Sequence, residues 1–214
     1  LWRVRALSSS FHSFSKKQLI ALSWWHDSSP FCGYDGLICD GAVRSGKTIV
    51  MSFAFVLWAM SNFNHTNFAI CGKTVSNAER NILRPFQQIE GKPFSVRYKI
   101  STRMMTVKCG QTENYFYLFG GKDESSYALI QGLTLAGVLF DEVALMPRSF
   151  VEQALARCSV EGSRFWFNCN PENPQHWFYL EWIKRAQEKN ALYVHFRMED
   201  NPSLSPEILA RYKG

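Results

Sequence analysis

Short, uniformly apolar runs alternate along the chain with longer segments that have helical periodicity. The runs are "LICD", "NFAICG", "LAGVLFDE", "SRFWFNC" and "LYVHFRM". Apolar runs of this length are typical of strands that are buried on both faces. The segments with helical periodicity predict helices over residues 46–60, 75–90, 149–157, 175–187 and 205–213. The alternation predicts an α/β fold with a mainly parallel central sheet, right-handed crossovers and helices on its faces.

One region interrupts this alternation. From Phe94 to Gly121 the runs "FSVRYKI", "MMTVKCG" and "NYFYLFGG" follow one another without a helix. We expect residues 94–121 to form an antiparallel insertion at the edge of the sheet. No linker, low-complexity tract or internal repeat divides the 214 residues, so a single domain over 1–214 is predicted.

A phosphate-binding motif lies between the first strand-like run and the first helical segment. The sequence "GAVRSGKT" fits the pattern Gly-x4-Gly-Lys-Ser/Thr. In this pattern backbone N–H groups surround the phosphates, the lysine reaches the β- and γ-oxygens, and the last hydroxyl ligates Mg²⁺. An ordinary Gly/Ser turn is the alternative, but the strand before and the helix after favour a phosphate loop. The predicted ATP contacts are Gly41, Ala42, Val43, Arg44, Ser45, Gly46, Lys47 and Thr48.

Composition narrows the classes of function. The chain is 46% hydrophobic and 20% charged, which suits a folded domain. The longest apolar run, Ile49–Met60, contains a serine and is too short to cross a bilayer, and we expect no signal peptide. Six dispersed cysteines without a CxxC pair argue against a zinc site and predict free, buried thiols. A net charge of +6 permits contact with a polyanion without requiring it.

The run "LAGVLFDE" ends in two adjacent carboxylates, Asp141 and Glu142. Ligands of open α/β sheets lie at the carboxyl ends of the strands. Alone, such a run is more often a strand that meets solvent, but after a phosphate loop it indicates a nucleotide site. We expect Asp141, with Thr48, to hold Mg²⁺ and Glu142 to activate the attacking water as general base. The adjacent glutamate favours ATPases that hydrolyse with water over kinases and switch GTPases.

A third polar strand end follows in "FWFNCNPENP". An amide at Asn168 or Asn170 would bond the γ-phosphate and the water, and so couple hydrolysis to movement. The alternative is a simple turn, since Asn-Pro is common turn chemistry. The two preceding motifs favour the coupling function.

Four segments in this order, "GAVRSGKT", "IQGLTLAGVLFDEVALMP", "FNCNPENP" and "RMEDNPSLS", resemble the large terminase subunit of tailed bacteriophages and prophages. The similarity extends over nearly the whole chain. It implies a P-loop fold of the additional-strand, catalytic-glutamate type, with that glutamate on the strand next to the phosphate loop. It further implies an ATPase motor, with ATP and Mg²⁺, that packages double-stranded DNA into a procapsid in the host bacterial cytoplasm. The implied partners are the DNA, other copies of the subunit in a ring, a portal protein and a small terminase subunit.

The resemblance also implies functions for two residues of less certain chemistry. Large terminases commonly carry an arginine inside the phosphate loop, so Arg44 would stabilise charge on the phosphates in the transition state. Otherwise Arg44 points to solvent or packs on a neighbouring subunit. The family's adenine pocket precedes the loop, where Gln18 offers an amide to the adenine edge and Phe11 or Phe14 a stacking face. The alternative for Gln18 is an ordinary position on a helix surface.

The sequence departs from the family in two respects. Some terminases place an arginine before the glycine ahead of the strand with the two carboxylates, where this chain has Gln131. An arginine that acts on a neighbour's ATP must then come from elsewhere, and Arg97, Arg103, Arg148 and Arg157 are unranked candidates. Full-length terminases continue into a nuclease domain with clustered acidic residues. The acidic residues after Glu142 are scattered, so we expect that domain to be absent from this chain.

The predicted insertion raises a DNA hypothesis. Arg97 and Lys99 alternate with apolar residues, so one face of the strand would be basic and contact phosphates without reading sequence. An ordinary solvated strand face is the alternative. Two other functions remain open for the chain as a whole. One is a helicase-like translocase, although a Ser-Ala-Thr coupling motif is missing, and the other is a nucleotide-gated binding module without useful turnover.

Overall fold

The computed structural model describes residues 14–88, 94–170 and 173–213, and these contain one eight-stranded mixed sheet. The strands lie in the order β3-β4-β5-β2-β6-β7-β1-β8. All pairs from β5 to β8 are parallel, while β3-β4 and β4-β5 are antiparallel. The bounds are β1 Gly36–Gly41, β2 Asn67–Gly72, β3 Ser95–Lys99, β4 Met104–Cys109, β5 Thr112–Gly120, β6 Gly137–Asp141, β7 Arg164–Asn168 and β8 Ala191–Phe196.

The predicted α/β class and the antiparallel edge are confirmed. The insertion is more closely joined to the sheet than a separate hairpin would be, because β5 pairs in parallel with β2 along the whole length of β2. One expectation about strand order is wrong. The strand that ends in Asp141 is not next to β1, because β7 lies between β6 and β1. This intervening strand is the additional strand of the predicted fold type.

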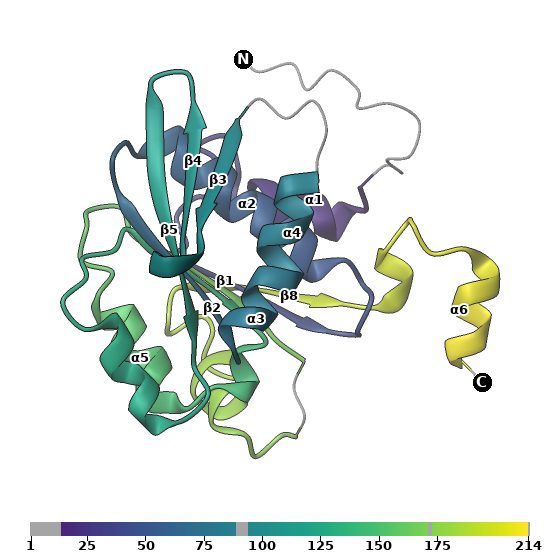
Figure 1. Cartoon of the computed structure of the whole chain (residues 1–214). Helices are drawn as coiled ribbons and strands as arrows, with labels where there is room; N and C mark the ends of the chain where they lie inside the picture. The colour runs from purple at the N-terminus through teal and green to yellow at the C-terminus, as the bar shows by residue number, and fades with distance from the viewer. Residues whose placement is uncertain (1–13, 89–93, 171–172, 214) are drawn as a thin grey trace.

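Helices cover both faces of the sheet. On one face lie α1 (Lys16–Ser23), α2 (Lys47–Asn62), α3 (Val75–Ala78) and α4 (Arg84–Gln88), and on the other lies α5 (Arg148–Ala156) (Figure 1). The core on the α2 side contains many aromatic rings because α2 is apolar on nearly all sides. Phe55 and Trp58 of α2 pack against Trp166 of β7 at ring centroid distances of 5.0 and 4.7 Å. This packing fixes the helix that begins at the phosphate loop.

The segment 75–90, predicted as one helix, is interrupted over its described part. α3 is followed by a π-helical turn, Glu79–Leu83, and then by α4. Pro85 has no N–H to donate to the carbonyl of Asn81, and its ring crowds that carbonyl in regular α geometry. The helix widens just before this proline, where the Arg84 N–H donates to the carbonyl of Glu79. The segment 175–187 is likewise not a regular helix, since it contains a second π-helical turn, Tyr179–Ile183.

Asn114 of β5 fixes the far end of α2. Its side chain is fully buried, and Nδ2 donates to the carbonyls of Ala59 and Phe63 at 3.1 and 2.9 Å. Its Oδ1 accepts from the N–H of Thr66 at 3.0 Å. The amide bonds to the carbonyl of Phe63, just past the end of the helix, and adds a second donor to the carbonyl of Ala59, which already accepts from the N–H of Phe63. The helix therefore has a fixed C-terminus as well as a fixed start.

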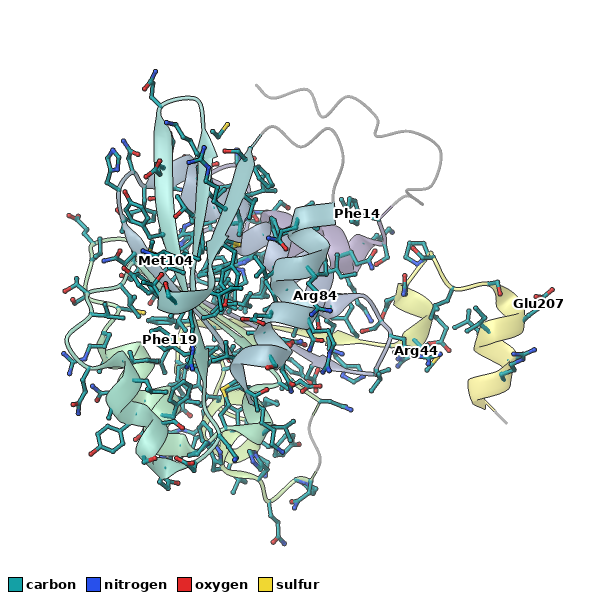
Figure 2. The ribbon with its side chains drawn as sticks, viewed as in Figure 1. Phe14, Arg44, Arg84, Met104, Phe119 and Glu207 are labelled. Atoms are coloured by element: carbon teal, nitrogen blue, oxygen red, sulfur yellow. The ribbon has the colours of Figure 1, made fainter. Side chains whose placement is uncertain are left out.

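The chain ends in a segment beside the phosphate loop. A 3₁₀ turn, Met198–Asp200, follows β8 and leads to α6 (Pro206–Lys213), which confirms the predicted final helix. Figure 2 shows Arg44 of the loop close to this segment. All six cysteines are free, and three of them, Cys39, Cys71 and Cys169, are buried as predicted.

Candidate nucleotide-binding site

The phosphate loop leaves the carboxyl end of β1 through two glycines with positive φ. Gly41 has φ of 113°, and a Cβ there would lie 2.0 Å from the carbonyl oxygen of Phe196 on β8. Gly46 has φ of 84° and directly precedes α2. A side chain at Gly46 would also meet the amide of Gln18 at 2.7 Å. Glycine is required at both positions, so the loop shape follows from the motif.

Lys47 is buried and turned back onto the loop. Its Nζ donates to the carbonyls of Gly41 and Ala42 at 2.9 and 2.7 Å and lies 3.3 Å from Oγ of Ser45. Burial lowers the pKa of Lys47, while the nearby acidic groups act in the opposite direction. The ammonium group is thus held at the start of α2, where the helix dipole favours an anion. In this structure the predicted phosphate ligand Lys47 therefore bonds to carbonyls of the loop itself.

Three motifs that are distant in the sequence meet at Asp141. Asn168 Nδ2 donates to Oδ1 of Asp141 at 2.7 Å and to Oγ1 of Thr48 at 2.8 Å. The Thr48 hydroxyl also lies 3.4 Å from the same carboxylate oxygen. Asp141 and Asn168 are almost fully buried at the ends of the adjacent strands β6 and β7. The structure therefore brings together Thr48, Asp141 and Asn168, as the sequence predicts.

This group fits the Mg²⁺ that the motif implies. A hydroxyl and a carboxylate are hard oxygen ligands, and Mg²⁺ commonly uses one or two protein ligands together with phosphates and waters. The buried carboxylate has amide donors that fix its orientation, which is the usual arrangement around a ligand oxygen. No cluster of three or more His, Cys, Asp or Glu side chains suited to a metal occurs within the described ranges.

Glu142 lies at the edge of this group in an unusual conformation. It has φ of 59° and ψ of 52°, the left-handed region, and it starts the 3₁₀ turn Val143–Leu145. Non-glycine residues rarely adopt this conformation, which costs about 1–2 kcal/mol. The side chain is exposed, whereas its neighbour Asp141 is buried. The turn thus places two adjacent carboxylates in different environments, one exposed and one buried.

Asn170 and the weaker candidates lie apart from this hydrogen-bonded group. Asn170 is exposed two residues after Asn168, and it is Asn168 whose amide reaches Asp141. Among the four candidate trans-acting arginines, Arg148 is paired with Glu152 at 2.5 Å on the surface of α5. Arg97 and Lys99 are exposed on β3.

Gln18 and Arg44 both lie in the immediate surroundings of the loop. Gln18 is buried, so a surface position is wrong for it. Its Oε1 accepts from the N–H of Ser15 at 3.0 Å, and its Nε2 lies 3.5 Å from the carbonyl of Ser45. Phe14 precedes this helix and is 41% exposed, while Phe11 lies outside the described residues. Arg44 is exposed, with φ of 65°.

Sequence reasoning missed three polar contacts of the site. Asn201 Nδ2 donates to the carbonyl of Arg44 at 2.6 Å, and Asn81 Nδ2 donates to Oδ2 of Asp141 at 2.9 Å. Next to the loop, an oxygen of buried Asp40 lies 2.9 Å from Nδ1 of His195 on β8. Asn201 lies in "RMEDNPSLS", one of the four segments that carry the family resemblance, but no contact was predicted for it, and nothing in the local sequence marked Asn81. These contacts depend on strand order and helix placement.

The comparisons with known proteins agree with this geometry. Residues 38–213 match the family model described as the N-terminal part of the terminase large subunit, T4likevirus type. The chain belongs to the large terminase family. No protein in the curated comparison matches it significantly. The family membership confirms the resemblance drawn from the four sequence motifs.

Solved terminase structures share the fold. The large terminase of a thermophilic bacteriophage is 53% identical, with a TM-score of 0.90, over 94% of this chain and 50% of that chain. The same phage protein in complex with ATP-γ-S matches at 50% identity and a TM-score of 0.88, over 94% and 49% of the two chains. The ATPase domain of the Thermus phage P74-26 large terminase matches at 17% identity and a TM-score of 0.61, over 82% and 79%, which shows the fold alone.

The terminase chain described here spans about half the length of the thermophilic phage protein that it resembles. Within its described parts, no helix is both long enough and apolar enough to cross a membrane.

Proposed function

We propose that this terminase chain is the ATPase motor domain that hydrolyses ATP to move double-stranded DNA into a procapsid. The observation that carries the proposal is the buried contact of Asn168 with both Asp141 and Thr48, at 2.7 and 2.8 Å. It joins the phosphate loop, the metal-binding strand and the coupling strand in one hydrogen-bonded group. The family membership supports the substrate, because the related terminase of the thermophilic bacteriophage forms a complex with ATP-γ-S.

Each side chain of the site has a separate function in the proposed hydrolysis. Loop amides and Lys47 bind and orient the phosphates, and Lys47 must leave the carbonyls of Gly41 and Ala42 to do so. Thr48 and Asp141 hold Mg²⁺, which when bound neutralises charge on the β- and γ-phosphates. Glu142 accepts a proton from the attacking water. Arg44 stabilises charge on the phosphates from the exposed side of the loop.

Asn168 is suited to couple hydrolysis to movement. Its amide already bonds a phosphate-loop hydroxyl and a metal-binding carboxylate, so a change at either one alters its hydrogen bonds. Asn170, two residues later, would carry that change into the loop beyond β7. Movement of this domain relative to a neighbouring subunit or to DNA would then depend on the state of the nucleotide.

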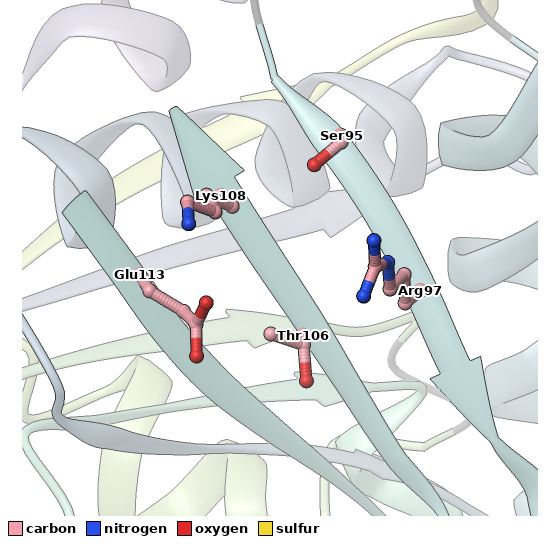
Figure 3. A pocket seen from close by; sticks show the side chains of 5 residues that line it. All are labelled: Ser95, Arg97, Thr106, Lys108 and Glu113. Atoms are coloured by element: carbon pink, nitrogen blue, oxygen red, sulfur yellow. The ribbon is translucent and has the colours of Figure 1, made fainter. Parts of the chain in front are cut away.

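The exposed face of the insertion supports a contact with DNA. Arg97 lies opposite Thr106, and Lys108 lies opposite both Ser95 and Glu113, so these side chains share one face of the sheet. They line a shallow hollow of about 260 Å³ (Figure 3). Lys99 continues the same face along β3. We propose that Arg97 and Lys99 contact DNA phosphates without reading sequence.

Mg²⁺-dependent ATP hydrolysis by the chain and by Glu142→Gln, with and without double-stranded DNA, tests the proposed activity. A motor subunit completed by its neighbours should show turnover that rises with protein concentration or DNA and is lost in the variant. ATP binding without any turnover that depends on Glu142 would contradict the proposal and would favour a nucleotide-gated binding module.

Salt dependence tests the proposed DNA contact separately. Reversal of charge at Arg97 and Lys99 should reduce the slope of log K against log salt by about 2, since each phosphate contact contributes about 0.9. Charge reversal at exposed Lys122, which lies outside the three insertion strands, is the matched control. An unchanged slope in the Arg97/Lys99 double variant would contradict the contact.

A further inference from the structure

Both carboxylate oxygens of Asp141 accept hydrogen bonds from amide side chains, and the second amide belongs to no recognised motif. Asn168 donates to Oδ1, while Asn81 Nδ2 donates to Oδ2 at 2.9 Å. A carboxylate held at Oδ2 cannot rotate freely about its last torsion. Oδ1 is therefore directed toward the hydroxyl of Thr48, the other candidate metal ligand. Asn81 thus restricts the orientation in which Asp141 meets a metal.

The orientation of the Asn81 amide is itself fixed. Its Oδ1 accepts from Nε of Arg80 at 3.3 Å, so the oxygen faces a cation and the NH₂ group faces the anion Asp141. Arg80 is exposed, and its Nη2 also donates to Oδ1 of Asn77 at 3.4 Å. An amide between opposite charges has one favourable orientation, because the reversed amide would place like partial charges against both neighbours.

The backbone that carries Asn81 is a π-helical turn, Glu79–Leu83. Such turns are uncommon, and they occur frequently at functional sites. The turn is attached to the insertion, because the Tyr98 hydroxyl of β3 donates to Oε1 of Glu79. Burial and the adjacent Glu79 raise the pKa of Tyr98, so the hydroxyl keeps its proton at neutral pH. One turn of helix thus contacts both the strand bearing Arg97 and the buried carboxylate of the nucleotide site.

We propose that Asn81 is a positioning residue that holds Asp141 for Mg²⁺-nucleotide, on a π-helical turn anchored to the insertion by the Tyr98–Glu79 hydrogen bond. The proposal rests on the proposed function, since it concerns the same nucleotide site. Asn81 acts through Asp141 and does not itself touch the phosphates. Its removal should change how strongly the metal contributes to nucleotide binding, with little effect on binding without metal.

Nucleotide affinity with and without metal tests the proposal. A fluorescent ATP analogue is titrated in EDTA and in excess Mg²⁺, and Mn²⁺ binding in the presence of ADP is followed by electron paramagnetic resonance. For Asn81→Ala we expect affinity in EDTA within about twofold of the unsubstituted chain and Mn²⁺ affinity lower by about 10–100-fold, the usual loss for a residue that orients a metal ligand. The turnover number should fall more than KM rises.

Asn62→Ala is the matched control, because Asn62 ends α2 and its amide donates to the carbonyl of Trp58 instead of to Asp141. It should keep the Mn²⁺ affinity of the unsubstituted chain. If Asn81→Ala does not fold, as judged by circular dichroism, Asn81→Ser keeps a polar group too short to reach Asp141 and should show the same loss. Tyr98→Phe removes one hydroxyl outside the site and should lower Mn²⁺ affinity to a smaller extent.

The outcomes separate the two proposals. If the unsubstituted chain binds nucleotide equally well in EDTA and Mg²⁺ and has no turnover, the proposed function fails. If the unsubstituted chain responds to Mg²⁺ and Asn81→Ala responds equally, the positioning proposal alone is overturned. A Tyr98→Phe variant identical to the unsubstituted chain would overturn the anchoring by the insertion. Additive effects of Asn81→Ala and Tyr98→Phe would also overturn it, since residues that act through one contact are not additive.

Discussion

Asn168 donates to Asp141 across two neighbouring strand ends, with Nδ2 2.7 Å from Oδ1. The register of the sheet makes this contact unavoidable, because Asp141 lies directly opposite Asn168 in the parallel ladder between β6 and β7. Side chains at paired positions of adjacent strands point to the same face. The carboxylate proposed to hold the metal and the amide proposed to couple hydrolysis are therefore neighbours through strand pairing.

Asn168→Ala should separate nucleotide binding from turnover. The variant keeps Lys47 and the loop amides, so ATP affinity without metal should stay within a fewfold of the unsubstituted chain. Turnover should fall about 10–100-fold, because the amide orients Asp141 and Thr48 around the metal. Asn173→Ala is the control, since Asn173 accepts from the N–H of Gln175 in the same region and lies outside the group. Equal turnover of Asn168→Ala and Asn173→Ala would contradict the assigned function of Asn168.

The elements that the sequence predicted best are those set by local pattern. The phosphate loop, the five buried parallel strands that flank it and the edge insertion follow from apolar runs and from two glycines with positive φ. Asp141, Thr48 and Asn168 could be grouped in advance because they end or follow parallel strands, which share one edge of a sheet. Strand order was harder to predict, and β7 was not expected between β6 and β1.

The contacts that could not be predicted join elements whose relative placement has no local signal. Asn81 reaches Asp141 from a π-helical turn that precedes Pro85, and the sequence had predicted a continuous helix there. Gln18 was predicted at the ATP site from the family resemblance, but its burial was not predicted, because that depends on how α1 packs against the start of α2. Asn201 meets the carbonyl of Arg44 because the segment after β8 passes the phosphate loop. Each contact depends on tertiary packing.

The left-handed conformation of Glu142 predicts that the backbone at this position lowers the free energy of unfolding. Glu142→Gly and Glu142→Ala both remove the carboxylate that we propose as general base, so both should lack turnover. Only glycine relieves the strain at φ of 59°, so Glu142→Gly should be more stable to urea than Glu142→Ala, by about 1 kcal/mol. Because both variants lose the same carboxylate, the difference in their stability reports the effect of the backbone conformation. Equal stabilities of the two variants would show that the backbone at this position is not strained.

The lowered pKa of Lys47 predicts opposite effects of alkaline pH on stability and on ATP affinity. The buried ammonium group loses its proton at lower pH than the same lysine in the unfolded chain. Between the two pKa values the unfolded chain binds more protons, so the stability of the nucleotide-free protein should rise with pH. ATP needs the charged form, so its affinity should fall over the same interval.

Urea unfolding and nucleotide titration from about pH 7 to 10 measure both effects, since this interval lies below the usual pKa of lysine. Lys47→Met removes the titrating group and should flatten the pH dependence of stability that this lysine contributes. Lys47→Arg stays charged throughout this range, so whatever ATP affinity it retains should not fall with pH. A Lys47→Met variant with the same stability slope as the unsubstituted chain would assign the pH dependence to another group.

Substitution of Asn114 should lower the stability of the fold without changing the nucleotide site. Asn114→Ala removes the side-chain hydrogen bonds of a fully buried position and leaves the carbonyl of Phe63 and the N–H of Thr66 without this partner, while the carbonyl of Ala59 keeps the N–H of Phe63. Loss of buried partners costs about 1–3 kcal/mol for each group that stays unsatisfied, so unfolding in urea should be easier by about 2–4 kcal/mol in total. The contacts of Lys47 and Asp141 lie at the opposite end of α2, so ATP affinity of the folded variant should remain unchanged. An unchanged free energy of unfolding would contradict the stabilising function of the Asn114 amide. Weak ATP binding by a variant of unchanged stability would instead place Asn114 in the nucleotide site.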